Sequence, residues 1–119
     1  MAMTNDRSTL SLRIDAPDGS RFGPGKAALL RAIEAHGSIS GGARALAMSY
    51  PRALRLVDQM NGQFGAPLVE TFHGGATRGG AALTQLGQDV AAAYEAVRKR
   101  AEAATAAERA ALMALIHRN

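Results

Sequence analysis

One apolar stripe near the C-terminal end constrains the fold of this chain more than any other feature. Aliphatic side chains and one tyrosine recur there at spacings of three and four residues: Leu86, Val90, Ala93, Tyr94, Val97 and Ala101. This spacing places them on one side of an α-helix. Continued to Ala104, the stripe fills about 20 residues and spans about 30 Å. So small a chain does not need a helix of that length to close its own core. The alternative is that the stripe only completes the core of its own chain. We therefore expect a second copy of the chain to cover part of the stripe.

The amino-acid composition favours a single, mainly helical domain. The chain has 119 residues, the length of one ordinary domain, and its hydrophobic content of 47% is enough for a core. Aromatic residues make up only 4% of the chain, and tryptophan is absent. The core is therefore expected to consist of aliphatic residues and many alanines, a mixture that favours closely packed helices.

Several classes of site and compartment are disfavoured. The absence of cysteine excludes disulfides and thiolate sites and is compatible with a reducing cytoplasm, where we expect the protein. No stretch approaches the roughly 18 apolar residues of a membrane span, so no membrane partner is expected. His36, His73 and His117 lack neighbours at metal-ligand spacing. We expect neither a metal nor another cofactor.

The first half of the chain shows three helix signals after a short strand. Alternating apolar residues at 10–14 predict the strand. A helix is expected from Pro24 to Gly37, a short one from about residue 39 to 47, and a third from about 49 to 62. The glycines in the first turn of the short helix are explained if its backbone packs closely against a neighbour. In the third helix, the inward positions are Ala53, Leu56 or Val57, and Met60.

The second half predicts a hairpin and then the long helix. Residues 67–72 and 81–84 form two short strands joined by a glycine-rich loop. Thr84 is a suitable N-cap for the long helix. Thr105 and Glu108 have the spacing of a capping box, so the helix is expected to restart there and expose Leu112, Leu115 and Ile116, with Met113 beside them.

This order of elements is that of a winged helix-turn-helix followed by a long C-terminal dimerisation helix. We assign residues 1–9 to a flexible tail, 10–83 to the DNA-binding domain and 84–119 to dimerisation. The third helix, at about 49–61, is the expected recognition helix, and residues 73–80 form the expected wing. No convergent nucleophile, acid–base pair or metal set is apparent, so an enzyme is not expected.

The expected site residues follow from this assignment. If the third helix buries Ala53, it turns its arginines outward, toward a major groove. The net charge of +4 permits a nucleic-acid partner. Double-stranded DNA is expected to contact Ser40, Arg44, Ser49, Tyr50, Pro51, Arg52, Arg55, Gln59 and Arg78. The dimer is expected to use Leu86, Val90, Ala93, Tyr94, Val97, Leu112, Leu115 and Ile116.

Structural alternatives remain open for several of these residues. Arg52 and Arg55 can form an ordinary solvated helix face. Tyr50 can pack against the wing, and Arg44 can pair with Glu34 instead of a phosphate. Asp58, which would repel phosphate, is expected to turn away or to accept a bond from Arg55 or a cytosine.

Residues 10–97 resemble the N-terminal domain of the molybdate-responsive regulators (ModE) and, more distantly, the LysR-type helix-turn-helix. The matching segments are Gly37-Ser38-Ile39-Ser40, Ala43-Arg44-Ala45-Leu46, Met48-Ser49-Tyr50, Leu56-Val57, Met60-Asn61, Pro67-Leu68-Val69-Glu70, Gly74-Gly75, Gly79-Gly80-Ala81, Leu83-Thr84 and Gly87. The resemblance implies a homodimer on an inverted-repeat operator, with the long helix at the dimer interface.

Two departures from the ModE pattern limit what the resemblance implies. Full-length members carry oxyanion-binding domains beyond the point where this sequence stops, so molybdate binding is not expected. Leu54 stands where the family often has tryptophan, and Thr77 and Arg78 interrupt a wing that is often mostly glycine. The base preference is therefore expected to differ. The alternative function is a winged-helix module that contacts only proteins, which the apolar C-terminal end and the modest charge suggest.

Overall fold

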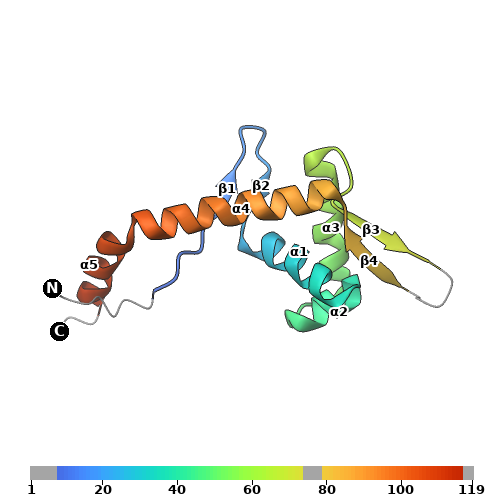
Figure 1. The fold of residues 1–119 in the computed structure, drawn as a ribbon, viewed down its shortest axis with the longest axis horizontal. Coiled ribbons are helices and arrows are strands. Elements are labelled where there is room, and N and C mark those ends of the chain that lie inside the picture. Colours follow the sequence, from blue (N-terminus) through green and yellow to red (C-terminus); the bar gives the residue numbers. More distant parts are fainter. Residues whose placement is uncertain (1–7, 74–78, 117–119) are drawn as a thin grey trace.

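The computed structural model describes residues 8–73 and 79–116. Its elements are β1 (Ile14–Asp15), β2 (Arg21–Phe22), α1 (Pro24–His36), α2 (Ile39–Ala45), α3 (Tyr50–Phe64), β3 (Val69–Phe72), β4 (Gly80–Leu83), α4 (Gln85–Ala104) and α5 (Ala106–Ile116). The helices α1, α2 and α3 and the β3–β4 hairpin form a body at one end of α4, and α5 lies at the other end (Figure 1). The prediction of a mainly helical fold with a small hairpin is confirmed.

The core lies between α1, α3 and the start of α4. Leu29, Leu30 and Ile33 of α1 are fully buried on one side of the helix. On α3 the inward face consists of Ala53, Val57 and Met60, all buried, whereas Leu56 is only partly buried. Burying a large aliphatic side chain contributes about 1.5–3 kcal/mol, so these facing stripes stabilise the body strongly.

Helix α2 packs against α1 through a glycine. A Cβ atom added at Gly42 would lie 2.9 Å from the backbone nitrogen of Ile33. Close backbone approach therefore explains this glycine, as the sequence suggested. The C-cap of α1 is Gly37 in the left-handed conformation, and the Ser38 hydroxyl caps α2 by accepting from the Gly41 nitrogen at 2.9 Å.

The β3–β4 hairpin is antiparallel, with Val69 opposite Leu83 and Phe72 opposite Gly80. It is tied to the helices at its base. The Ala81 nitrogen donates to the Gly37 carbonyl at 2.8 Å. The predicted N-cap Thr84 is confirmed, since its hydroxyl accepts from the Gly87 nitrogen at 3.0 Å. The direction of the hairpin is thus set by the ends of α1 and the start of α4.

The N-terminal region differs from the predicted strand. Residues 10–13 form no strand; only Ile14–Asp15 does, paired antiparallel with Arg21–Phe22, which the sequence did not predict. Phe22 anchors this second hairpin, because its buried ring makes edge contacts with Phe64 and Tyr94 at centroid distances of 6.0 and 5.3 Å. Tertiary contacts, rather than local alternation, therefore hold this segment.

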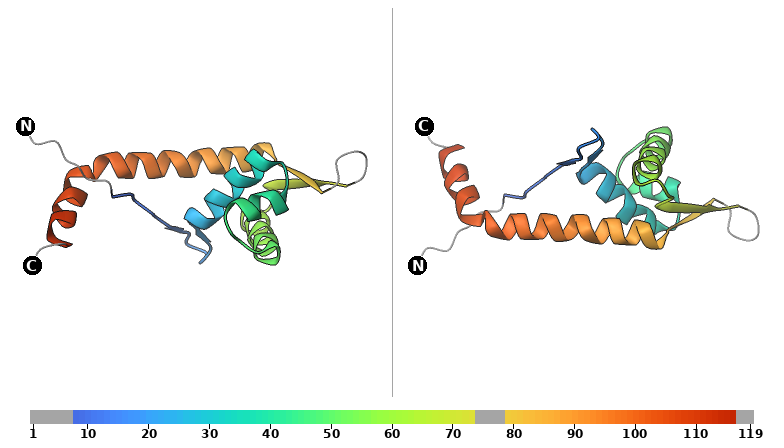
Figure 2. Two further views of the ribbon diagram at one scale, coloured as in Figure 1. Left: turned by 90° about the horizontal axis from the view of Figure 1, so that it is seen from below. Right: turned by 90° about the horizontal axis from the view of Figure 1, so that it is seen from above.

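Helix α4 ends at Thr105 and the chain continues in α5, so the predicted restart is confirmed. The Thr105 hydroxyl donates to the Ala101 carbonyl at 2.7 Å and accepts from Arg109 Nε at 3.1 Å. Arg109 also donates to the Ser8 hydroxyl at 2.8 Å, so a residue assigned to the flexible tail contacts α5. The two views in Figure 2 show α5 turned sharply away from the axis of α4.

Candidate DNA-binding surface

The connection between α2 and α3 is a tight turn. The Ala47 nitrogen donates to the Arg44 carbonyl at 3.1 Å, and the Met48 nitrogen donates to the Ala43 carbonyl at 2.9 Å. Ala47 adopts a positive φ of 53°, which lets the chain reverse within a few residues. The Ser49 hydroxyl then caps α3 by accepting from the Arg52 nitrogen at 3.3 Å. These bonds fix the direction of α3 relative to α2.

Helix α3 turns a polar face outward, opposite its buried stripe. The predicted residues Arg52, Arg55 and Gln59 are all exposed, and Tyr50 is 49% exposed. Arg52 and Arg55 are three residues apart and therefore share one side of the helix. Pro51 is exposed in the first turn of the same helix. Arg52, Arg55 and Gln59 thus lie together on one exposed side of α3, whereas Tyr50 lies in the first turn on a different side.

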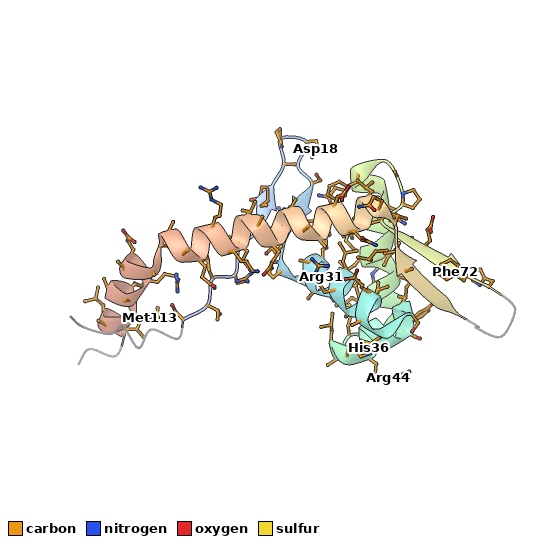
Figure 3. All side chains as sticks on the ribbon, in the orientation of Figure 1. Asp18, Arg31, His36, Arg44, Phe72 and Met113 are labelled. Atoms are coloured by element: carbon orange, nitrogen blue, oxygen red, sulfur yellow. The ribbon has the colours of Figure 1, made fainter. Side chains whose placement is uncertain are left out.

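Arg44 adds a third exposed arginine next to this face. It lies in the last turn of α2 and projects away from the body on the side opposite α4 (Figure 3). The alternative pairing with Glu34 is not observed, because Glu34 instead binds Arg31 at 3.0 Å on α1. Arg44 is therefore directed to solvent.

These arginines carry uncompensated charge within the part of the chain that the structure describes. The described ion pairs are Arg13–Asp15, Arg31–Glu34, Arg98–Glu95 and Arg98–Glu102. None of them involves Arg44, Arg52 or Arg55, so of the alternatives considered for Asp58 the bond from Arg55 is not formed in the described structure. By contrast, Arg98 on α4 holds the pKa of Glu95 below its usual value by hydrogen bonding. Arg44, Arg52 and Arg55 have no such partner among residues 8–73 and 79–116.

A cleft of about 310 Å³ separates α2 and the start of α3 from the part of the β3–β4 hairpin where the strands run into their connecting loop. Ser40 and Tyr50 line it together with His73 and Gly79. Tyr50 thus faces the hairpin while half of its surface stays accessible. His73 was included in the expected wing but not singled out as a contact, because its position beside Ser40 depends on tertiary packing that the sequence does not show. The predicted contact Arg78 lies outside the described residues.

The residues expected at the dimer interface fall into two groups. On α4, Ala93 and Val97 are exposed, and Leu86 and Val90 are partly buried. On α5, Leu112, Leu115 and Ile116 are 55%, 58% and 57% exposed. These seven side chains are accessible.

Tyr94 requires a correction. It is buried in its own protomer against Phe22, and its hydroxyl donates to the Leu12 carbonyl at 2.6 Å. Its spacing placed it on the edge of the stripe, but Phe22 and the N-terminal segment cover that edge. Tyr94 therefore belongs to the core rather than to an exposed interface.

Across residues 8–73 and 79–116, no three His, Cys, Asp or Glu side chains gather as a metal ion would require. No helix in these ranges combines the length and the apolar character of a membrane span.

Comparison with known proteins identifies relatives over this region. The family described as "Bacterial regulatory helix-turn-helix protein, lysR family" matches residues 26–88, more than half of the chain. The molybdenum-pterin-binding protein MopB of Rhodobacter capsulatus is 44% identical over 79 residues, which are 66% of this chain and 29% of that protein. The molybdenum transport protein ModE of Azotobacter vinelandii is 35% identical over 95 residues, 80% of this chain and 35% of that protein.

The chain therefore spans about a third of the length of these curated relatives. The crystal structure of the CbnR_DBD–DNA complex has the same fold, with a TM-score of 0.59 at 22% identity, covering 73% of this chain and 94% of that chain. The helix-turn-helix of this chain is of the ModE N-terminal type, as its relatives show. The matched family model shows that the chain belongs to the LysR family of bacterial regulatory helix-turn-helix proteins, which are DNA-binding transcription regulators.

Proposed function

We propose that this protein recognises a specific DNA site as a homodimer, with α3 in the major groove. One observation carries the proposal: Arg44 on α2 and Arg52 and Arg55 on α3 are all exposed and pair with none of the carboxylates in the described structure. Phosphates and guanine edges are the partners that satisfy such arginines in a bidentate way. Membership of a regulator family also supports the expectation that the protein is not an enzyme.

The dimensions of α3 suit this role. A helix with its side chains is about 10–12 Å wide, and the major groove is about 12 Å wide. With the start of α3 in the groove, Arg52 and Arg55 reach base edges or the flanking phosphates. Arg44 and Ser40 on α2 then face one backbone strand of the duplex, and His73, at the loop end of β3, faces the same strand across the cleft.

The homodimer is proposed from the stripe on α4. Val90, Ala93 and Val97 lie on one side of that helix, with Ala93 and Val97 exposed in the protomer. A two-fold dimer through this stripe presents two copies of α3 related by symmetry. Such a pair reads an inverted repeat, with recognition helices roughly 34 Å apart, or a multiple, if they occupy successive major grooves on one side of the duplex.

The test is the salt dependence of binding to a duplex enriched from a random library. Each arginine that neutralises a phosphate steepens the slope of log K against log salt by about 0.9. An arginine that binds a guanine contributes discrimination of about 1–3 kcal/mol, which is about 5- to 150-fold. Arg52→Ala combined with Arg55→Ala is therefore expected to flatten the slope or to lower the affinity by about 5-fold or more per arginine.

The matched control is Arg31→Ala combined with Lys99→Ala, which removes the same total charge from exposed positions on α1 and α4. The control is expected to retain nearly full affinity. Equal losses in both double variants would mean that only overall charge matters. A flat salt response of the unmodified protein would contradict the proposal and favour the protein-contact alternative.

A further inference from the structure

An apolar groove of about 390 Å³ lies beside the stripe on α4. The β1–β2 hairpin and the end of α3 form one wall, and the middle of α4 forms the other. Its apolar lining includes Ile14, Phe22, Phe64, Val90, Ala93 and Val97. Ile14, Phe64 and Val97 remain 42%, 39% and 45% exposed. The protomer therefore leaves large apolar side chains uncovered along this groove.

Helix α5 presents the complementary surface. None of its described residues is buried, and Leu112, Leu115 and Ile116 occupy one face because they are three and four residues apart. Their exposed fractions, 55–58%, are the highest among the large apolar residues of the described structure. A second apolar surface is thus uncovered, at the opposite end of α4 from the body (Figure 2).

Within one chain these two surfaces are held apart. Arg109 fixes the direction of α5, donating to the Glu102 carbonyl at 2.6 Å and to the Ser8 hydroxyl at 2.8 Å. The groove ends at Val97, and α5 begins at Ala106 and points away from the body (Figure 1). An α5 that reaches the groove must therefore come from another molecule.

Two-fold symmetry brings the second molecule to the right place. A parallel partner along the α4 stripe would set the two β1–β2 hairpins against each other, whereas an antiparallel partner separates them. In the antiparallel arrangement, the C-terminal half of the partner's α4 would lie beside Val90 and Ala93. Because α5 starts two residues after α4 ends, the partner's α5 would then emerge next to the groove. Symmetry makes the same contact twice.

We propose that α5 of each copy docks in the apolar groove of the other copy, through Leu112, Leu115 and Ile116. This inference rests on the proposed homodimer and names its second contact. The docked α5 follows directly on the α4 that forms the proposed interface. Its aliphatic side chains contact the exposed ring of Phe64 at the mouth of the groove. The C-terminal helix thereby locks the spacing of the two recognition helices.

The absence of cysteine from the chain allows a direct test by cross-linking. Phe64→Cys in one chain and Leu112→Cys in another are co-expressed with different tags and treated with a short bismaleimide at low concentration. A mixed covalent dimer is expected for most of the dimers that pair one chain of each kind, because each chain contributes one half of the contact. Ala45→Cys, at an exposed position on α2, replaces Leu112→Cys as the control for random collision and is expected to give only background.

Two further cross-linking experiments separate the possible outcomes. Phe64→Cys with Ala104→Cys tests whether the partner's α4, rather than α5, fills the groove; a stronger product there overturns the inference. Val97→Cys alone reports on the α4 dimer, and DNA binding by the unmodified protein reports on the proposed function. Cross-linking through Val97 together with DNA binding, but with a 64–112 product no higher than background, would refute the docking of α5 and leave the proposed function standing.

Discussion

Replacing Gly42 by alanine tests the packing that positions the helix-turn-helix. Alanine is preferred over glycine in a helix interior by about 1 kcal/mol. At Gly42 the added Cβ lies 2.9 Å from the Ile33 nitrogen and 3.2 Å from the Ala32 carbonyl carbon. These backbone atoms cannot rotate away, so α1 and α2 must separate, and overpacking of this kind costs about 1–3 kcal/mol. The steric term therefore outweighs the propensity, and Gly42→Ala is expected to lower the free energy of unfolding by up to about 2 kcal/mol.

Gly62→Ala is the matched control. It makes the same chemical change near the end of α3, where the added Cβ would meet no atom within 4 Å. This variant is expected to be more stable than the unmodified protein by up to about 1 kcal/mol. Since the propensity gain is common to both variants, the difference between them measures the contact at Gly42. Urea unfolding at one fixed protein concentration supplies both values. Equal stabilisation by the two substitutions would refute the close approach of α1 and α2.

Two further substitutions are expected to change the stability of the protein. Tyr94→Phe removes the bond to the Leu12 carbonyl and should cost about 1 kcal/mol. Burial raises the pKa of the Tyr94 hydroxyl in the folded protein. As the pH rises, the hydroxyl therefore loses its proton in the unfolded chain first, at about pH 10. The free energy of unfolding falls from that pH until the pH reaches the higher pKa of the folded protein. Urea unfolding should show this alkaline loss in the unmodified protein and not in Tyr94→Phe; the same loss in both would contradict it. Ser49→Ala removes the cap of α3 and should cost about 1 kcal/mol in thermal unfolding, whereas Ser11→Ala at an exposed position should cost nothing measurable.

The helices could be predicted because their signals are local. Gly37 ends α1 and Ser49 begins α3 through geometry that depends on a few neighbouring residues. The spacing of Ala53, Val57 and Met60 then fixed which side of α3 is buried. The outward direction of Arg52 and Arg55 follows from the same period, so the candidate surface was accessible to sequence reasoning.

The features that were not predicted depend on contacts between distant residues. Strand β2 is two residues long, and it is held because Phe22 packs against Tyr94, far along the chain. The same contact moved Tyr94 from the expected interface into the core. A helical period of 3.6 residues shows that a side chain lies on an apolar face, but not whether its own chain or a partner covers it. Glu34 likewise forms its ion pair with Arg31, three residues away on α1, and not with Arg44.

Selection from a random duplex library tests the central claim most directly. Purified protein is incubated with the library, the bound fraction is recovered over several rounds, and the recovered duplexes are sequenced. We expect enrichment of one inverted repeat, with half-sites separated by about one helical turn or a multiple of it. That result would establish specific binding and two-fold symmetry together. Recovery of no common sequence, with weak retention that does not change with salt, would contradict the account.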